Sequence, residues 1–278
     1  MANRKNTIIL NKGVGRWTHI QRLSDINRRS FLKCSMGALA APILMSCNDS
    51  TPTTAPVYSP KLTARPELPS LSPTIGLSRL GLENSRDGIL YVPESYSPDT
   101  AAPLFVALHG AGGSSSDWES YHARMEARGM ILLVPESRSY TWDLVLGSYG
   151  PDVNFLDRAL QHTFERCRID PTRLVLGGFS DGASYALSLG LINGDLFSHI
   201  VAYSPGFYLQ TNAFVGKPKI YISHGTLDNI LPVIYSRLSI VPDLRAAGYE
   251  VTYNEFEGGH EVPAAVSEAA LDWILNVI

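Results

Sequence analysis

Ser180 lies in the pentapeptide Gly-Phe-Ser-Asp-Gly at 178–182, whose residue types and spacing suit a nucleophile. A sharp strand-to-helix turn can raise such a serine above a sheet, and the flanking glycines let the neighbouring backbone pass without a Cβ clash. The context fits, because an apolar run at 174–176 precedes the pentapeptide and helically spaced apolar residues follow at 183–191. The alternative interpretation is a Gly-rich turn in which the serine only caps a helix.

A serine hydroxyl is a weak nucleophile near neutral pH, so it needs a base, and that base needs a group to orient it. His260 is the candidate base, because it follows two glycines just after an expected strand. Asp228 is the candidate orienting acid, four residues past the expected strand at 220–223. The alternatives are a surface or helix-capping histidine and an Asx-turn aspartate.

An acyl-transfer site also needs two backbone N–H groups aimed at the developing oxyanion. The amide of Asp181, directly after the serine, is one candidate. The other is the amide of Ala111, with Gly112 as second choice, in the His-Gly-Ala-Gly-Gly loop that begins at His109. We expect His109 itself to support this loop rather than to take part in catalysis.

Strand and helix patterns alternate along the chain, which predicts an α/β fold with a mostly parallel central sheet flanked by helices. Sites in such sheets lie at the carboxyl ends of the strands, where all the candidates above are found. About 200 residues leave no room for a large lid. We expect strands at 88–93, 104–108, 131–134, 174–176, 200–203, 220–223 and 250–256. We expect helices at 116–128, where Ser116 and Glu119 have capping-box spacing, and at 151–164, 183–191 with Gly194 as cap, 232–247 and 266–277.

The charge of the chain is distributed unevenly. The 278 residues carry a formal net charge of −3, but the first 47 hold eight Lys or Arg and one acid. The remainder therefore carries 15 basic and 25 acidic residues, a net charge of −10. Because phosphate binding requires a basic face, this balance argues against nucleic acid as a partner of the folded part.

The basic N-terminal segment predicts a targeting signal. Asn-Arg-Arg-Ser-Phe-Leu-Lys at 27–33 resembles a twin-arginine export signal, and a short apolar stretch follows at 36–45. Cys47 ends a Leu-Met-Ser-Cys sequence that resembles a bacterial lipoprotein box, so we expect lipidation there and a membrane-anchored protein of the cell envelope. The alternatives are cleavage without a lipid, giving a periplasmic or secreted protein, and a disordered cytoplasmic tail.

Composition divides the rest of the chain into two parts. Residues 48–74 are rich in Pro, Thr and Ser, which predicts a linker outside the core. The catalytic domain is then expected at 75–278, after the linker at 48–74 and the export signal at 1–47.

The motifs at 109–113, 178–182, 224–228 and 258–260 together resemble the α/β-hydrolase superfamily, over about 86–278. They are most similar to the phospholipase/carboxylesterase family, with dienelactone hydrolases and polyhydroxybutyrate-depolymerase-like esterases beside it. The resemblance implies Ser180, Asp228 and His260 as a catalytic triad. It also implies the amides of Ala111 and Asp181 as oxyanion donors. The chain departs from the carboxylesterase pattern at Asp181 and Ala183, where that family usually has Gln and Gly, and from dienelactone hydrolases in having Ser180 in place of a cysteine.

These features predict a serine hydrolase that cleaves a small carboxylic ester through an acyl-enzyme, without metal or cofactor. A serine peptidase or thioesterase of the same fold is the first alternative, and a non-catalytic envelope binding protein is the second. Loop aromatics could form the walls of the substrate site, and we expect Trp142, Tyr149 and Phe207 in this role, with Tyr140 and Tyr208 beside them.

Overall fold

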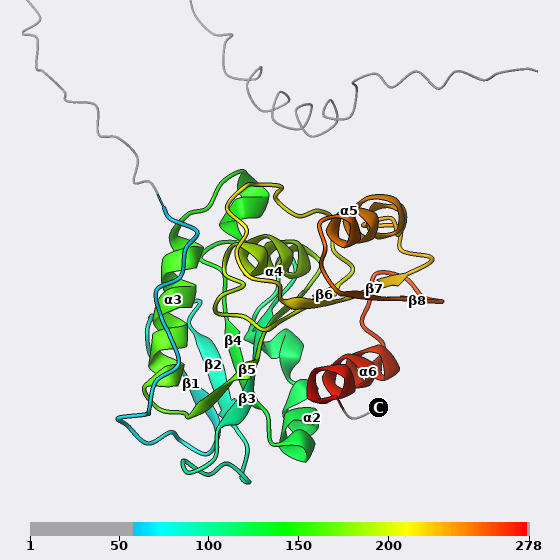
Figure 1. Cartoon of the computed structure of the whole chain (residues 1–278). Coiled ribbons are helices and arrows are strands. Elements are labelled where there is room, and N and C mark those ends of the chain that lie inside the picture. The colour runs from blue at the N-terminus through cyan, green and yellow to red at the C-terminus, as the bar shows by residue number, and fades with distance from the viewer. Residues whose placement is uncertain (1–57, 277–278) are drawn as a thin grey trace, which may run out of the picture. The chain divides into compact units, whose positions relative to one another are not determined.

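A computed structural model of the chain describes residues 58–276 and shows an α/β fold built on one eight-stranded sheet (Figure 1). The strand order is β1-β2-β4-β3-β5-β6-β7-β8. The first two strands run antiparallel to their neighbours, and the pairs from β4 to β8 are all parallel. The strands are β1 (Gly76–Arg79), β2 (Gly88–Val92), β3 (Ala102–Leu108), β4 (Ile131–Pro135), β5 (Ile169–Phe179), β6 (His199–Tyr203), β7 (Lys219–Gly225) and β8 (Val251–Phe256).

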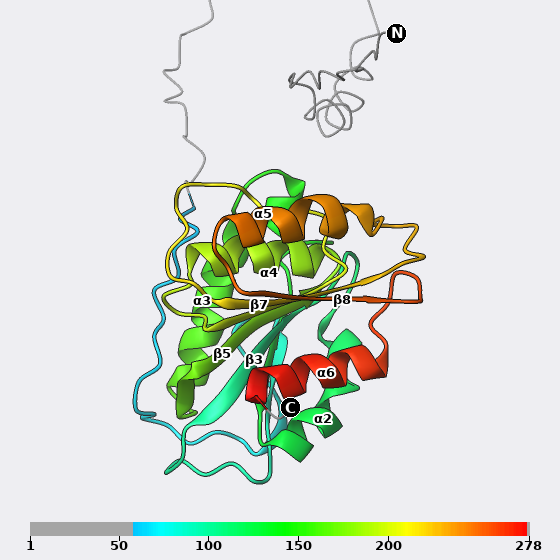
Figure 2. The same cartoon turned by 45° about the vertical axis from the view of Figure 1, so that its right-hand side comes forward.

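Helices cover both faces of the sheet, with α3, α4 and α5 on one face and α2 and α6 on the other (Figure 2). Strand β3 is buried along its whole length, so its side chains alternate between two apolar layers. Leu104, Val106 and Leu108 pack towards α3 and α4, whereas Phe105 and Ala107 pack towards α2 and α6. The helices are α2 (Tyr121–Arg128), α3 (Pro151–Phe164), α4 (Asp181–Ile192), α5 (Val241–Ala246) and α6 (Ala264–Leu275).

The predicted fold class is confirmed, and each predicted strand is present. Six of them differ from the prediction by at most two residues at either end, whereas β5, predicted at 174–176, extends over Ile169–Phe179. Strand β8 lies at one edge of the sheet, as its alternating pattern indicates. Strand β1 was not predicted, because its four residues, Gly-Leu-Ser-Arg, contain no apolar run. The pairing of β1 with β2 therefore depends on the sheet already being formed.

The helix predicted at 116–128 begins differently in the structure. A 3₁₀ turn, η1 (Ser115–Trp118), precedes α2, and the capping box belongs to Ser114 and Asp117 rather than to Ser116 and Glu119. The predicted box had the right spacing but lay two residues too late. Gly194 does not cap α4 either, because Asn193 occupies that position.

The helix predicted at 232–247 is interrupted by wider turns. Residues Ser236–Ile240 form a π-helical stretch, η3, that leads into α5. Pro242 lies in the first turn of α5 and has no N–H to donate. A proline inside a helix removes a backbone bond and crowds the preceding turn, which is a physical reason for the wider spacing here.

The described part of the predicted linker, 58–74, differs from the prediction, because its first residues pack on the domain. Leu62 and Ala64 are buried in the same apolar cluster as α3 and α4. The amide of Leu62 donates to the side chain of Asn193, and those of Thr63 and Ala64 donate to Asp157. Proline-rich composition correctly indicated the lack of helix and strand, but not these side-chain partners for the backbone.

The export signal, the lipidation site at Cys47 and the first part of the linker lie outside the described residues. Across 58–276, none of the helices has both the length and the apolar character that a membrane span requires.

Candidate active site

Ser180 occupies a strained turn between β5 and α4. Its φ of 58° and ψ of −119° are unusual for a residue with a side chain, and its amide donates to the carbonyl of Tyr203 on β6. A Cβ on Gly178 would lie 2.4 Å from the backbone of Gly182, and a Cβ on Gly182 would lie 2.3 Å from the carbonyl oxygen of Leu108. Both glycines are therefore required by close backbone approach, as the motif predicts.

His260 brings the three predicted side chains together. Its Nε2 lies 2.8 Å from Ser180 Oγ, and its Nδ1 lies 2.6 Å from Asp228 Oδ2. Because a carboxylate only accepts, Nδ1–H donates to Asp228 and Nε2 is left to accept from the serine hydroxyl. Ser180, Asp228 and His260 follow β5, β7 and β8, so the parallel strand ends gather residues that lie far apart in the sequence.

Close packing of the neighbouring loops holds the imidazole in place. A Cβ on Gly225, at the end of β7, would lie 2.2 Å from the carbonyl oxygen of Gly259. The ring of Phe179 lies against the His260 ring, with 4.7 Å between centroids. The histidine loop can therefore lie directly over the strand end that carries Asp228.

Asp228 is buried, and all the hydrogen bonds that it accepts favour its charged form. The amides of Ile230 and Leu231 donate to Oδ1, while His260 donates to Oδ2. Burial by itself would raise the pKa of this carboxyl, but the bonds from His260 and the two amides hold the pKa below its usual range. The Asx-type turn that the sequence offered as an alternative is thus present together with the contact to the histidine.

His224 is a site residue to which the sequence analysis gave no role. It is fully buried, its Nδ1 lies 2.8 Å from Ser236 Oγ, and its Nε2 lies 2.6 Å from the carbonyl oxygen of Leu231 and 3.3 Å from Asp228 Oδ2. Burial lowers the pKa of this imidazole, so the ring is neutral, with Nε2–H donating and Nδ1 accepting from Ser236. The four-residue spacing to Asp228 was the available signal.

The loop after β3 lies beside Ser180, because a Cβ on Gly110 would be 3.4 Å from the serine Cβ. The amide of Gly112, the second choice as oxyanion donor, is occupied by the carbonyl of Tyr140 at 2.7 Å. Within the described residues, the amides of Ala111 and Asp181 donate to no acceptor. These two N–H groups are therefore available to a ligand.

His109 supports the loop after β3 through hydrogen bonds of its ring. Its Nδ1–H donates to the carbonyl of Gly110, and its Nε2 accepts from the amide of Ser137. Burial lowers the pKa of the ring, which favours this neutral form. Among the described residues its ring nitrogens contact Arg86, Gly110 and Ser137, so the supporting role that we expected fits its contacts.

The predicted substrate walls are partly wrong. Trp142 is completely buried, and its indole N–H donates to the carbonyl of His109, so it stabilises the loop and cannot touch a substrate. Tyr149 is half-buried and packs edge-on against Tyr185. Phe207 is half-buried against the core. Aromatic residues in loops indicate burial as readily as ligand contact, and Trp142 is a buried one.

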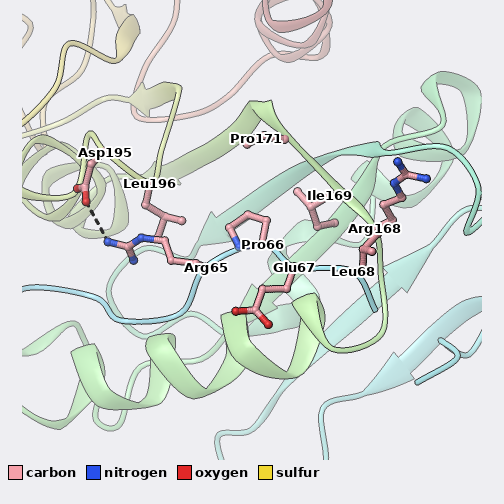
Figure 3. Close-up of a pocket in the computed structure, with 9 residues that line it drawn as sticks. All are labelled: Arg65, Pro66, Glu67, Leu68, Arg168, Ile169, Pro171, Asp195 and Leu196. Carbon is pink, nitrogen blue, oxygen red and sulfur yellow. Dashed lines mark hydrogen bonds and ion pairs between the residues drawn. The ribbon is translucent and has the colours of Figure 1, made fainter. Parts of the chain in front are cut away.

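Two pockets differ in their relation to the triad. One, of about 310 Å³, is lined by His260 and Phe179 and therefore borders the site. The other, of about 420 Å³, lies near Ile169 at the beginning of β5, the strand end opposite to Ser180 (Figure 3). There Arg65 is paired with Asp195, and none of the triad residues lines the pocket. The smaller pocket is the one that the chemistry can use.

Comparisons with known proteins agree with this geometry. Residues 153–278, which include Ser180, Asp228 and His260, match the family model described as Phospholipase/Carboxylesterase. Feruloyl esterase C of Emericella nidulans is 24% identical over 206 residues, which are 70% of this chain and 71% of the relative. Acyl-protein thioesterase 1 of Gibberella zeae is 27% identical over 211 residues, 62% of this chain and 88% of the relative.

Solved structures show the same fold. The crystal structure of esterase PE8 aligns with a TM-score of 0.59 at 22% identity, covering 73% of this chain and all of that one. A ferulic acid esterase of Anaeromyces mucronatus, in complex with ferulic acid, aligns with a TM-score of 0.52 at 19% identity, covering 68% and 84%. The sheet, the strand-to-helix turn at Ser180 and the solved structures give this chain the α/β-hydrolase fold, and its part at 153–278 is similar to the phospholipase/carboxylesterase family.

Proposed function

We propose that the protein is a serine esterase in which Ser180, His260 and Asp228 act as a catalytic triad. The observation that carries this proposal is the position of His260, within 2.8 Å of the serine hydroxyl and 2.6 Å of the carboxylate. An imidazole bonded on both sides in this way can take the serine proton during attack on an ester and return it later.

In the first half of the reaction, Ser180 Oγ attacks the ester carbonyl and its proton passes to His260 Nε2. The carbonyl oxygen becomes negative and accepts from the amides of Ala111 and Asp181, which have no other acceptor among the described residues. The imidazolium then protonates the alcohol oxygen as the ester C–O bond breaks. The alcohol leaves, and an acyl-Ser180 ester remains.

In the second half, a water molecule attacks the acyl-enzyme and His260 removes its proton. The tetrahedral intermediate collapses, the carboxylic acid leaves, and Ser180 regains its proton from the imidazolium. Asp228 stays ionised throughout and stabilises the charged form of His260. Its lowered pKa suits this role, because the carboxylate does not take up the proton.

Esters of small aromatic acids such as ferulic acid are the substrate class that the relatives support. Several curated relatives are feruloyl esterases or probable feruloyl esterases, between 22% and 29% identical to this chain. The acyl-protein thioesterase among the relatives supports thioester hydrolysis as a second candidate. Methyl ferulate, p-nitrophenyl butyrate, a butyryl thioester and an aminoacyl anilide form a panel that separates ester, thioester and peptide cleavage.

A fluorophosphonate probe tests the nucleophile directly, because it reacts with an activated serine and needs no knowledge of the substrate. We expect the wild-type protein to be labelled and Ser180→Ala to be unlabelled. Ser184→Ala is a suitable control, because Ser184 lies in α4 and its hydroxyl bonds to backbone. If the wild type is not labelled and turns over no acyl substrate, a non-catalytic binding protein becomes the better interpretation.

We also propose that the protein is exported and anchored through Cys47. The twin arginines at 28–29 and the Leu-Met-Ser-Cys sequence at 44–47 support this proposal. Replacing Arg28 and Arg29 by lysine should retain the protein inside the cell, as fractionation would show. Cys47→Ser should release it from the membrane fraction, and unchanged fractionation of both variants would contradict the proposal.

A further inference from the structure

The pocket of about 310 Å³ beside His260 has an apolar base and a polar rim. Trp118, Phe179 and Val262 are buried or half-buried, whereas Asp117 and Glu261 are exposed. Trp118 is fixed by packing on Phe105 and Tyr121, so the base of the pocket is rigid.

The position of the pocket beside His260 places it near the alcohol part of a bound ester. In the proposed mechanism His260 delivers a proton to the alcohol oxygen, so the alcohol must lie on the histidine side of the reacting carbon. The carbonyl oxygen lies on the other side, at the loop of Ala111 and the start of α4. Because His260 itself lines the pocket and Glu261 and Val262 follow it in the chain, the pocket lies where the leaving alcohol must go.

The rim offers hydrogen-bond acceptors. One oxygen of Asp117 accepts from the amide of Ser114, and one oxygen of Glu261 accepts from the amide of Gly259. In the part of the chain that the structure describes, the second oxygen of each carboxylate has no hydrogen-bond donor. Such oxygens can accept from hydroxyl groups of a ligand and would repel an anion.

The positive charge at the pocket is already balanced. Arg124 contributes to the lining, but its Nε is 2.8 Å from Glu268 Oε1, on α6. The groups at the rim that still lack a partner are therefore hydrogen-bond acceptors, the carboxylate oxygens of Asp117 and Glu261. Because the two carboxylates are exposed, solvent and salt screen their attraction for a cation.

We propose that this pocket is the alcohol subsite, and that it selects esters of neutral, hydroxyl-bearing alcohols about the size of glycerol or one small ring. The proposal rests on the proposed esterase function. It assigns Trp118, Phe179 and Val262 to apolar contact with the alcohol, and Asp117 and Glu261 to its hydroxyl groups. Anionic alcohols are excluded from the same place.

Esters that share one acyl group isolate the alcohol, because all of them form the same acyl-enzyme. We would compare 1-monobutyrin, ethyl butyrate, butyrylcholine and the butyryl ester of glycolate in the full-length protein. The wild type should prefer 1-monobutyrin in kcat/KM, and the glycolate ester should be the poorest substrate. Glu261→Ala should lower kcat/KM for 1-monobutyrin about fivefold, the value of one exposed hydrogen bond, and leave ethyl butyrate within about twofold.

Val262→Trp provides an independent test because it fills the base of the pocket. It should lower kcat/KM for 1-monobutyrin more than for ethyl butyrate. The rate at which butyryl-enzyme is hydrolysed, measured after the burst with p-nitrophenyl butyrate, should not change, since the alcohol has already left. Leu68→Trp is the matched control, because Leu68 is exposed and lines the distant pocket.

The outcomes separate this proposal from the proposed function. If fluorophosphonate labels Ser180 in every variant but Glu261→Ala and Val262→Trp affect all four butyrates equally, the subsite assignment is wrong. If Val262→Trp slows hydrolysis of the butyryl-enzyme and also lowers kcat/KM for 1-monobutyrin and ethyl butyrate equally, the pocket holds the acyl group instead. A protein that fluorophosphonate does not label at Ser180 would overturn the esterase mechanism as well.

Discussion

At the scale of single residues, the site depends on the hydrogen bonds around Asp228. This carboxylate accepts from His260 on one oxygen and from the amides of Ile230 and Leu231 on the other. The neutral ring of His224 also lies against this carboxylate, with its Nε2 3.3 Å from Oδ2. Because His260 and the two amides donate, the carboxylate is held in its charged form and aimed at Nδ1 of His260.

Asp228→Asn should remove most of the activity with little change in the fold. The amide can present an N–H to His260, which favours the tautomer with the proton on Nε2, and that nitrogen can then no longer accept from Ser180. We expect kcat to fall about 10³-fold or more. Steady-state kinetics with p-nitrophenyl butyrate would measure it, and labelling by fluorophosphonate should slow in parallel.

Asp195→Asn is the control for this substitution. Asp195 is also an aspartate with two cationic partners, Lys61 and Arg65, but these ion pairs are partly exposed and lie at the other end of the molecule from Ser180. It should retain wild-type kcat. An Asp228→Asn enzyme as active as Asp195→Asn would remove Asp228 from the catalytic mechanism.

The sequence allowed the three residues of the proposed triad to be predicted, because each lies in a glycine-containing motif just after a strand. It did not allow the surroundings to be predicted to the same extent. Trp142 is an aromatic residue in a loop, which suggested a substrate wall, yet its indole N–H donates to the carbonyl of His109 inside the core. His224 is four residues from Asp228, but only the folded loop brings its Nε2 to the same oxygen that His260 uses.

At the scale of elements, the turn from β5 into α4 carries the proposed nucleophile, Ser180, and depends on two glycines. A Cβ on Gly178 would be 2.4 Å from Gly182, in a region where neither backbone can move without shifting the sheet or the helix. Overpacking of this kind costs about 1–3 kcal/mol and sometimes more. The geometry of Ser180 should therefore be lost before the fold is.

Gly178→Ala should abolish fluorophosphonate labelling and lower the melting temperature. Gly259→Ala is the matched control, since a Cβ there would meet nothing within 4 Å although the residue is next to His260. It should keep both labelling and stability near wild type. Equal labelling of the two variants would show that the motif glycines are not sterically required.

For the segment before β1, residues 58–75, amino-acid composition gave the least accurate prediction. Prolines and small polar residues predicted a linker, but Leu62 is 1% exposed and its amide is bonded to Asn193. A single apolar side chain with polar anchors on either side gives no periodic pattern, so sequence periodicity could not reveal it. The fold therefore begins earlier in the chain than residue 75.

Leu62→Ala should test this contribution. Loss of a fully buried leucine typically costs about 3 kcal/mol, whereas an exposed leucine costs little. Leu68→Ala, six residues later and 78% exposed, is the matched control. Chemical denaturation monitored by circular dichroism should show a large shift for the first variant and almost none for the second, and equal midpoints would mean that the segment only rests on the surface.

At the scale of the whole molecule, five buried or half-buried histidines should make the free energy of unfolding depend on pH. Burial is the main cause that lowers the pKa of each, and for His199 the value falls to about 4. Two carboxyls oppose this trend, because burial raises the pKa of Asp152 to about 6 and also raises that of Asp143. The histidines with lowered pKa are His109, His122, His162, His199 and His224.

The sign of the effect follows from proton uptake. Between about pH 6.5 and pH 4 the unfolded chain binds a proton at residue 199 and the folded chain does not, so the free energy of unfolding decreases as the pH falls. Above pH 6.5 both states are neutral there and the contribution disappears. Protonation of Asp152 in the folded chain, from about pH 6 downwards, raises the free energy of unfolding instead. The histidines with lowered pKa are more numerous than such carboxyls, so the net effect is a loss of stability as the pH falls.

His199→Gln should therefore flatten the dependence of the melting temperature on pH between 7 and 4, whatever its effect at pH 7. The ring of His199 packs edge-on against Trp273 and bonds to Ser198, so some loss of stability at neutral pH is expected as well. His162→Gln, on a half-buried ring whose pKa is lowered less, should change the slope by a smaller amount. Because the slope reports only the difference in bound protons, an unchanged slope in His199→Gln would mean that residue 199 titrates alike in the folded and unfolded chain.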